Sequence, residues 1–232
     1  MYATVAELWR YPVKSLLGEQ LHEVLVEERG VVGDRLYAVT DRSGKLGSGK
    51  TTRRFRRLDG LFDLSARSEG ERPFVTLPDG REFAAGDAEL DTFLSERYGD
   101  ELRVLREDGV PHHDAAPLHL LTTSSLRWLE NILPASRIDV RRFRPNVLLD
   151  AAGAALVEDA WVGRRLALGS TVIRVVQRTE RCVMTTHAQS ELPKDPEVLR
   201  AVTELNDVCV GVYASVEQPG LIRVGDALRA LS

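Results

Sequence analysis

Residues 208–216 read Val-Cys-Val-Gly-Val-Tyr-Ala-Ser-Val, and this stretch decides the class of fold. The turn-forming residues Gln218-Pro219-Gly220 follow it, and a second apolar run occupies residues 221–224. β-Branched runs bounded by proline and glycine are typical of strands joined by a turn. The C-terminal part of the chain is therefore predicted to be β-structure.

Short alternating or β-branched runs recur along the rest of the chain. They predict strands at residues 3–9, 22–27, 35–41, 62–68, 74–77, 81–83, 146–150, 165–168 and 171–176. Pro78-Asp79-Gly80 separates two of these runs, as a hairpin turn does. The N-terminal half is therefore predicted to contain antiparallel strands.

Three segments have helical spacing of their apolar residues. The first runs from Asp87 to about Tyr98, and the second runs from Thr122 or Thr123 to Pro134. The third begins after Asp195. Capping residues at their starts, and a glycine or proline at the ends of the first two, mark their limits. We expect a mainly β, α+β fold with about three helices, divided into domains at residues 1–110 and 111–232 by the charged, proline-containing segment 108–117.

The composition is that of a soluble globular protein. The 232 residues are 43% hydrophobic and 28% charged, with a formal net charge of −4, which argues against a nucleic-acid partner. Only four of the 31 Lys and Arg residues are lysines. Arginine favours bidentate contacts with phosphate or carboxylate, although a bias in codon usage explains the same count.

The sequence has no membrane-spanning pattern. No stretch approaches the roughly 20 apolar residues that a membrane helix needs, and the N-terminus has no signal-peptide pattern. We therefore expect a cytoplasmic protein without a membrane partner. The two cysteines, Cys182 and Cys209, are too few for a disulfide framework.

Residues 44–51 read Gly-Lys-Leu-Gly-Ser-Gly-Lys-Thr, which matches the P-loop expression. A P-loop needs a buried parallel strand before it and a core-facing helix that begins at its lysine. Here residues 41–44 form a turn pattern, and residues 51–57 contain four arginines without an apolar stripe. We interpret the segment as a basic, glycine-rich hairpin loop.

Cys182 follows an apolar strand and lies beside Arg178 and Arg181. Neighbouring positive charge favours the thiolate, the form that binds soft metals or attacks as a nucleophile. A small buried core residue is the alternative reading, and it is the one we favour for Cys209, which lies inside an apolar run. The five histidines show no zinc-ligand spacing.

Two further segments carry polar side chains where strands are interrupted. Residues 11–15 read Tyr-Pro-Val-Lys-Ser, and residues 141–146 read Arg-Arg-Phe-Arg-Pro-Asn. Either segment alone is compatible with a solvated loop. If a lysine, a serine and several arginines converged on one cleft, they would form an anion site.

Taken in order, these segments resemble the MOSC family, which is named after the C-terminal domain of molybdenum cofactor sulfurase. Residues 11–15 with Gly18, followed by Gly33-Asp34-Arg35, look like the family's N-terminal β-barrel part. The segments 143–146, 158–161, 181–186 and 211–214, with 219–220 and 224–226, look like the MOSC domain itself. The resemblance covers nearly the whole chain, and it implies a MOSC-type β-barrel with a smaller N-terminal β-barrel part and peripheral helices.

Within the family, the segments are most similar to the branch that contains amidoxime-reducing components, which reduce N-hydroxylated compounds with a molybdopterin cofactor. By this resemblance Cys182 is the molybdenum ligand and the catalytic residue. The other implied cofactor-binding residues are Lys14, Ser15, Arg35, Thr51, Thr52, Arg53, Thr122, Ser125, Arg144 and Asn146. After Thr186 the chain departs from the family's acidic loop, so substrate preference is not carried over.

The resemblance implies a reductase that acts on a small-molecule substrate and takes electrons from a separate ferredoxin- or flavin-type protein. Two other functions remain open. Cys182 could carry persulfide sulfur to another metal centre, or the chain could bind the cofactor without turnover. The reductase retains pterin and molybdenum, whereas a carrier purifies without metal and with extra sulfur on Cys182.

Overall fold

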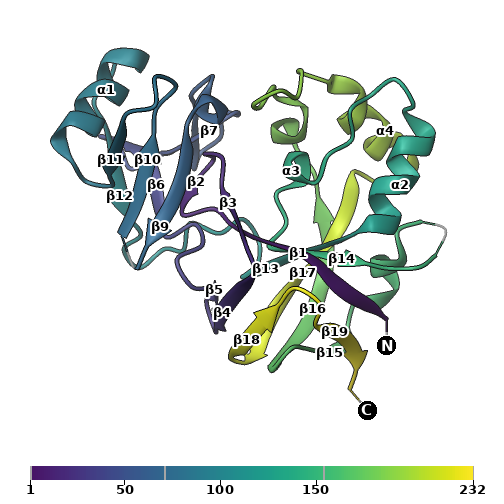
Figure 1. Cartoon of the computed structure of the whole chain (residues 1–232). Coiled ribbons are helices and arrows are strands. Elements are labelled where there is room, and N and C mark those ends of the chain that lie inside the picture. Colours follow the sequence, from purple (N-terminus) through teal and green to yellow (C-terminus); the bar gives the residue numbers. More distant parts are fainter. Residues whose placement is uncertain (1, 71, 154, 232) are drawn as a thin grey trace.

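The structure is a computed structural model that describes residues 2–70, 72–153 and 155–231 (Figure 1). Its main feature is a closed barrel. The barrel strands, in spatial order, are β14 (Val147–Asp150), β13 (Leu118–Thr122), β17 (Cys209–Gln218), β16 (Thr171–Glu180), β15 (Arg165–Leu168), β19 (Ala227–Ala230) and β1 (Ala3–Arg10). β1 pairs with β14 and closes the ring. Buried aliphatic side chains, among them Leu8, Leu120 and Val212, fill one continuous core.

A second β-rich unit lies beside the barrel, at the left of Figure 1. One of its sheets contains β12 (Leu102–Arg106), β6 (Tyr37–Asp41), β7 (Leu46–Ser48) and β8 (Phe55–Arg57), with β2 (Val13–Lys14) paired to β6. The other contains β11 (Glu82–Ala84), β10 (Arg72–Thr76) and β9 (Ser65–Glu69). This unit has its own core, which includes Leu64, Leu90 and Leu94. The mainly β prediction is confirmed.

Several N-terminal strands lie outside the second unit and join the barrel side. β1, from the start of the chain, belongs to the barrel, and β3 (Glu19–Leu21) pairs with it. A third small sheet joins β4 (Glu23–Glu27) and β5 (Gly30–Val31) to β18 (Gly220–Arg223) from the far end of the chain. The division at residue 110 stays a prediction, because the sheets themselves combine strands from both sides of it.

The three predicted helices are present as α1 (Ala88–Tyr98), α2 (Thr123–Ile132) and α4 (Pro196–Asn206). Thr122 caps α2 by accepting a hydrogen bond from the Ser125 amide, and Asp195 caps α4 in the same way through the Glu197 amide. The sequence did not predict α3 (Val140–Phe143) or the 3₁₀ turns η1 (Leu61–Asp63), η2 (Val157–Trp161) and η3 (Val183–Thr186). These segments are too short for a periodic pattern.

Two strand predictions need correction. Residues 62–68 were predicted to be one strand, but η1 occupies their start and β9 begins only at Ser65. The strand predicted from residue 35 begins at Tyr37, because Arg35 has a φ of 50° in the left-handed region. In the P-loop-like segment, β7 pairs antiparallel with β6, as a hairpin does, but residues 46–48 form a buried strand and not a loop.

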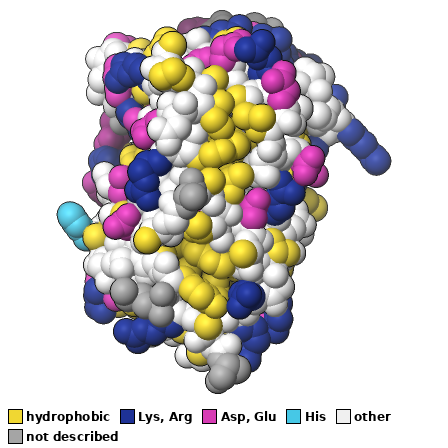
Figure 2. Space-filling model, turned by 90° about the vertical axis from the view of Figure 1, so that its right-hand side faces the viewer, with side chains coloured by type: hydrophobic (Ala, Val, Ile, Leu, Met, Phe, Trp, Pro, Cys, Tyr) yellow, Lys and Arg dark blue, Asp and Glu magenta, His cyan; other side chains and the backbone are white. Residues whose placement is uncertain are grey.

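Figure 2 shows the side of the molecule on which α2 lies. Basic and acidic side chains are interspersed there around a band of apolar ones. Among the described residues, no helix combines the length and the apolar character that crossing a bilayer requires.

Candidate functional site

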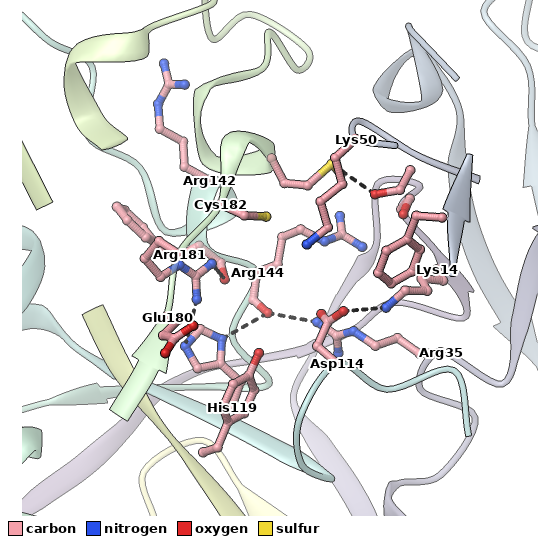
Figure 3. Close-up of a pocket in the computed structure, with 16 residues that line it drawn as sticks. Lys14, Arg35, Lys50, Asp114, His119, Arg142, Arg144, Glu180, Arg181 and Cys182 are labelled. Carbon is pink, nitrogen blue, oxygen red and sulfur yellow. Dashed lines mark hydrogen bonds and ion pairs between the residues drawn. The ribbon is translucent and has the colours of Figure 1, made fainter. Parts of the chain in front are cut away.

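A cavity of about 190 Å³ lies between the two β-rich units and draws its lining from both (Figure 3). Its cationic lining residues are Lys14, Arg35, Lys50, Arg142, Arg144 and Arg181, against the carboxylates Asp114 and Glu180. The cavity is therefore strongly positive, as a site for an anionic ligand should be. Ser15 and Cys182 also line it.

Lys14 is held at the end of β2 and is 5% exposed. Its Nζ donates to Asp114 Oδ1 over 2.7 Å, and it lies 5.4 Å from the centre of the Phe55 ring. Burial lowers the pKa of Lys14, and Asp114 opposes that shift. In return, the positive charges of Lys14 and Arg35 hold the pKa of Asp114 well below its usual range. The two side chains form an ion pair between β2 and the segment that connects β12 to β13.

Arg35 is anchored by the fully buried Asp34, with 2.5 Å between Nη1 and Oδ2. Its Nη2 donates to the carbonyl of Arg144 over 3.0 Å, and its guanidinium lies 4.8 Å from the centre of the Tyr11 ring. Burial opposes its charge, but Asp34 and Asp114 raise the pKa of Arg35 overall. Arg35 is therefore a fixed cation at the wall of the cavity.

Arg144 follows α3 in the left-handed conformation, with a φ of 54°. Its Nη1 donates to the Leu16 carbonyl over 2.7 Å, and its guanidinium stacks 4.1 Å from the centre of the Tyr11 ring. Its Nη2 is buried and has no hydrogen-bond partner among the described residues. Burial lowers the pKa of Arg144 to about 10, so it remains protonated at neutral pH. A buried donor without an acceptor is rare in folded proteins and needs an explanation.

Cys182 lies between β16 and η3, and its side chain is half-buried. Figure 3 shows its thiol pointing into the space between the two units. The preceding Arg181 donates from Nη2 to the Phe143 carbonyl over 2.7 Å, while its buried Nε has no partner in the described part of the chain. The local backbone is fixed because the Thr185 amide and hydroxyl both donate to the Cys182 carbonyl.

His119 connects the two arginines of the barrel side. Its Nδ1 lies 3.3 Å from the Arg144 carbonyl, and its Nε2 lies 3.4 Å from Arg181 Nη1. Burial and the charge of Arg181 hold the pKa of His119 well below its usual range, so the ring is neutral. A neutral ring with the proton on Nδ1 satisfies both contacts. Gly211 leaves room for the ring, because a Cβ there would lie 2.6 Å from His119 Nε2.

The structure brings together five of the predicted site residues: Lys14, Ser15, Arg35, Arg144 and Cys182. It does not place Thr51, Thr52 and Arg53 in the cavity lining, since all three are exposed. Thr52 instead accepts hydrogen bonds from the amides of Arg54 and Phe55. The nearby residues that do line the cavity are Ser48, Lys50 and Phe55.

Asn146 holds the backbone of His119 in place. Its Oδ1 accepts a hydrogen bond from the backbone amide of His119 over 3.1 Å, and the backbone amide of Asn146 donates to the His119 carbonyl over 2.8 Å. Thr122 and Ser125 also lie outside the lining. Their hydroxyls both donate to the fully buried Glu158, each over 2.6 Å. Asn146, Thr122 and Ser125 therefore bind other protein groups and do not line the cavity.

Glu158→Ala is expected to destabilise the fold by about 3 kcal/mol, because it leaves the hydroxyls of Thr122 and Ser125 without their acceptor. Urea unfolding of this variant is compared with that of Glu130→Ala, an exposed position on the same helix as Ser125. Equal unfolding midpoints for the two variants would show that the buried carboxylate does not hold these hydroxyls.

Sequence reasoning missed Asp114, His119 and Tyr213 as lining residues. Asp114 was predicted only as part of a segment between domains. His119 gave one usable signal, because it is a polar residue inside the buried run of β13.

Comparisons with known proteins agree with this architecture. The MOSC domain profile matches residues 107–229, and the profile of the MOSC N-terminal beta barrel domain matches residues 2–96. Mitochondrial amidoxime-reducing component 1 of Mus musculus is 24% identical over 98% of this chain and 82% of its own length. The human protein of that name is also 24% identical, over 98% and 83%.

A solved structure shares the fold. The YuaD protein of Bacillus subtilis is 13% identical, with a TM-score of 0.56 over 98% of this chain and 94% of that one. Because the MOSC domain profile alone spans more than half of the sequence, the chain belongs to the MOSC domain family.

Proposed function

We propose that this chain binds a molybdopterin cofactor in the cavity between its two units and reduces N-hydroxylated compounds, with Cys182 as the protein ligand of the metal. The observation that carries the proposal is the group of buried cations around one half-buried thiol. Two of these cations, Arg144 and Arg181, have a buried donor without a partner among the described residues. An anionic ligand would supply the missing acceptors.

The residues present fit such a cofactor. Its phosphate carries a charge of about −1.5 to −2, which Lys14 and Arg35 are suited to bind, with the Ser15 hydroxyl as a further donor. When bound, the cofactor supplies the two-electron chemistry that removes oxygen from nitrogen. Relatives named amidoxime-reducing components support this class of substrate.

The protein's own residues would balance the charge of the cofactor and hold it in position. Arg181, next in sequence to Cys182, also lines the cavity and adds positive charge to its wall. Its guanidinium is fixed by the Phe143 carbonyl and the His119 ring. The ion pair of Lys14 and Asp114 ties β2 to the segment between β12 and β13 at the cavity wall. These contacts hold the walls of the cavity in place around a ligand.

Electrons would come from a separate ferredoxin- or flavin-type protein. An iron–sulfur cluster needs about four cysteine ligands, whereas this sequence contains only two cysteines. Under this proposal, an external donor supplies the electrons for repeated turnover.

An artificial reductant tests the activity without the natural donor. Protein from a cofactor-producing host is reduced with dithionite and viologen, and benzamidine formed from benzamidoxime is measured. Protein from a host that cannot make the cofactor is the control. We expect product only from the first preparation. Equal rates in both preparations would contradict the proposal.

A second function, sulfur transfer, is favoured by the same half-buried thiol beside a fixed arginine. A carrier would show an intact mass one sulfur atom heavier, lost in Cys182→Ser, and no retained metal. Mass spectrometry of the purified protein separates the two functions.

A further inference from the structure

Lys50 belongs to the P-loop-like segment and lines the cavity between the two units. Figure 3 shows its side chain extending into the space between them. Within the described residues its ammonium group makes no ion pair, and its Nζ lies 5.2 Å from the centre of the Phe55 ring. The positive charge of Lys50 is therefore not neutralised by a protein carboxylate.

Contacts at the end of β7 bring Lys50 to this wall. The Gly49 amide donates to Met184 Sδ over 3.1 Å, and the Ser48 hydroxyl donates to the same sulfur over 3.7 Å. A Cβ on Gly49 would lie 2.3 Å from His187 Nε2 and 2.7 Å from Met184 Sδ. Because glycine has no side chain, the end of the strand can approach η3 this closely. The next residue, Lys50, is thereby placed where the two units meet.

Phe55 contacts three cations at once. Its ring is 8% exposed and lines the same cavity. The distances from the ring centre are 5.4 Å to Lys14 Nζ, 5.2 Å to Lys50 Nζ and 5.5 Å to Arg54 Cζ. A cation within about 6 Å of a ring centre is attracted by the negative face of the ring. This attraction opposes the mutual repulsion of the three charges.

The two lysines differ from Arg54 in what they face. Arg54 donates to the Pro111 carbonyl and is not among the described residues that line the cavity. Lys14 and Lys50 do line it, and Asp114 forms an ion pair with Lys14 but not with Lys50. Two ammonium groups thus meet one carboxylate at this side of the cavity. The excess positive charge suits an anion.

We propose that Lys50 binds the anionic ligand of this cavity together with Lys14, and that Phe55 is a positioning residue that holds both ammonium groups for it. The inference rests on the proposed function for the identity of the anion, a phosphate group. The P-loop-like segment then contributes one side chain to phosphate binding, in place of the loop amides that a P-loop uses.

Phosphate binding to the cofactor-free chain tests the role of Lys50. The full chain is prepared in a host that cannot make the cofactor, and inorganic phosphate binding is followed by ³¹P NMR. Lys50→Met removes the charge and keeps the length of the side chain, so we expect the Kd to rise about tenfold. Lys45→Met, just before β7 and outside the cavity lining, is the matched control and should change the Kd less than about twofold. Equal losses in the two variants would overturn the inference and leave Lys14 and Arg35 as the phosphate site.

Replacements of Phe55 separate positioning from packing. Phe55→Leu keeps an apolar side chain but removes the ring, and we expect it to raise the Kd for phosphate about fivefold. Phe55→Tyr keeps the ring and should stay within about twofold of the wild-type Kd. The combined loss in Phe55→Leu with Lys50→Met should be smaller than the product of the two single losses, because both changes act on the same ammonium group. Equal losses in Phe55→Leu and Phe55→Tyr, or fully independent effects of Phe55 and Lys50, would contradict the positioning role.

The phosphate measurement is independent of the reductase activity, because it needs neither molybdenum nor turnover. A cofactor-loaded protein that fails to reduce benzamidoxime would overturn the reductase function and leave this inference standing. A wild-type chain that does not bind phosphate would overturn the inference, whatever its activity.

Discussion

Cys182→Ser is expected to abolish molybdenum-dependent reduction while the melting temperature stays within about 3 °C of the wild-type value. Cys182 is half-buried at the cavity wall, and the contacts that fix its backbone come from Thr185 and not from its sulfur. Serine therefore preserves the fold and removes the metal ligand. Reduction of benzamidoxime with dithionite and viologen, together with thermal unfolding, checks both parts.

Cys209→Ser is the matched control. Cys209 is 7% exposed in β17, and burial raises the pKa of its thiol. A serine hydroxyl placed there costs about 1–3 kcal/mol of stability, while activity per bound molybdenum should remain at the wild-type level. Wild-type activity in Cys182→Ser would remove the ligand assignment.

Lys14→Met is expected to weaken cofactor binding about 10- to 100-fold, the loss of one charge-assisted hydrogen bond. The fold should tolerate the change, because methionine keeps the apolar contact with Phe55 and the side chain of Asp114 is 51% exposed. Pterin fluorescence of protein passed through gel filtration gives the fraction of cofactor retained. Lys45→Met, in the hairpin turn away from the cavity, is the control.

Arg35→Ala should lower pterin content as well, but it is a less specific variant. It leaves the fully buried Asp34 without its charged partner, with the Tyr11 amide still donating to it, and breaking such a pair costs about 3–5 kcal/mol. Stability and cofactor retention therefore fall together. Full pterin retention in both Lys14→Met and Arg35→Ala would contradict the phosphate site.

The sequence predicted most of the fold because its regular elements have local signals. The valine-rich run of β17 and the caps of α2 and α4 lie within short windows of sequence. It did not predict which strands share a sheet. β1 closes the barrel against β14, more than a hundred residues away, and no local pattern encodes that pairing.

The prediction of the site had the same limits: residues with a local signal were identified, and a residue that depends on a long-range contact was missed. Lys14 and Cys182 were singled out for their chemistry and their family resemblance, and the fold brings both to one cavity. Thr51 and Thr52 were chosen by position alone, and they lie just outside the lining. Asp114 was missed because its role depends on its contact with Lys14. The two residues lie far apart in the sequence, and only the folded chain brings them together.

Metal analysis tests the central claim most directly. Protein purified from a cofactor-producing host is assayed for molybdenum and pterin per chain, beside Cys182→Ser prepared in the same way. The account predicts about one of each per wild-type chain, with molybdenum lost from the variant. Wild-type protein free of both, with sulfur added to Cys182, would contradict it.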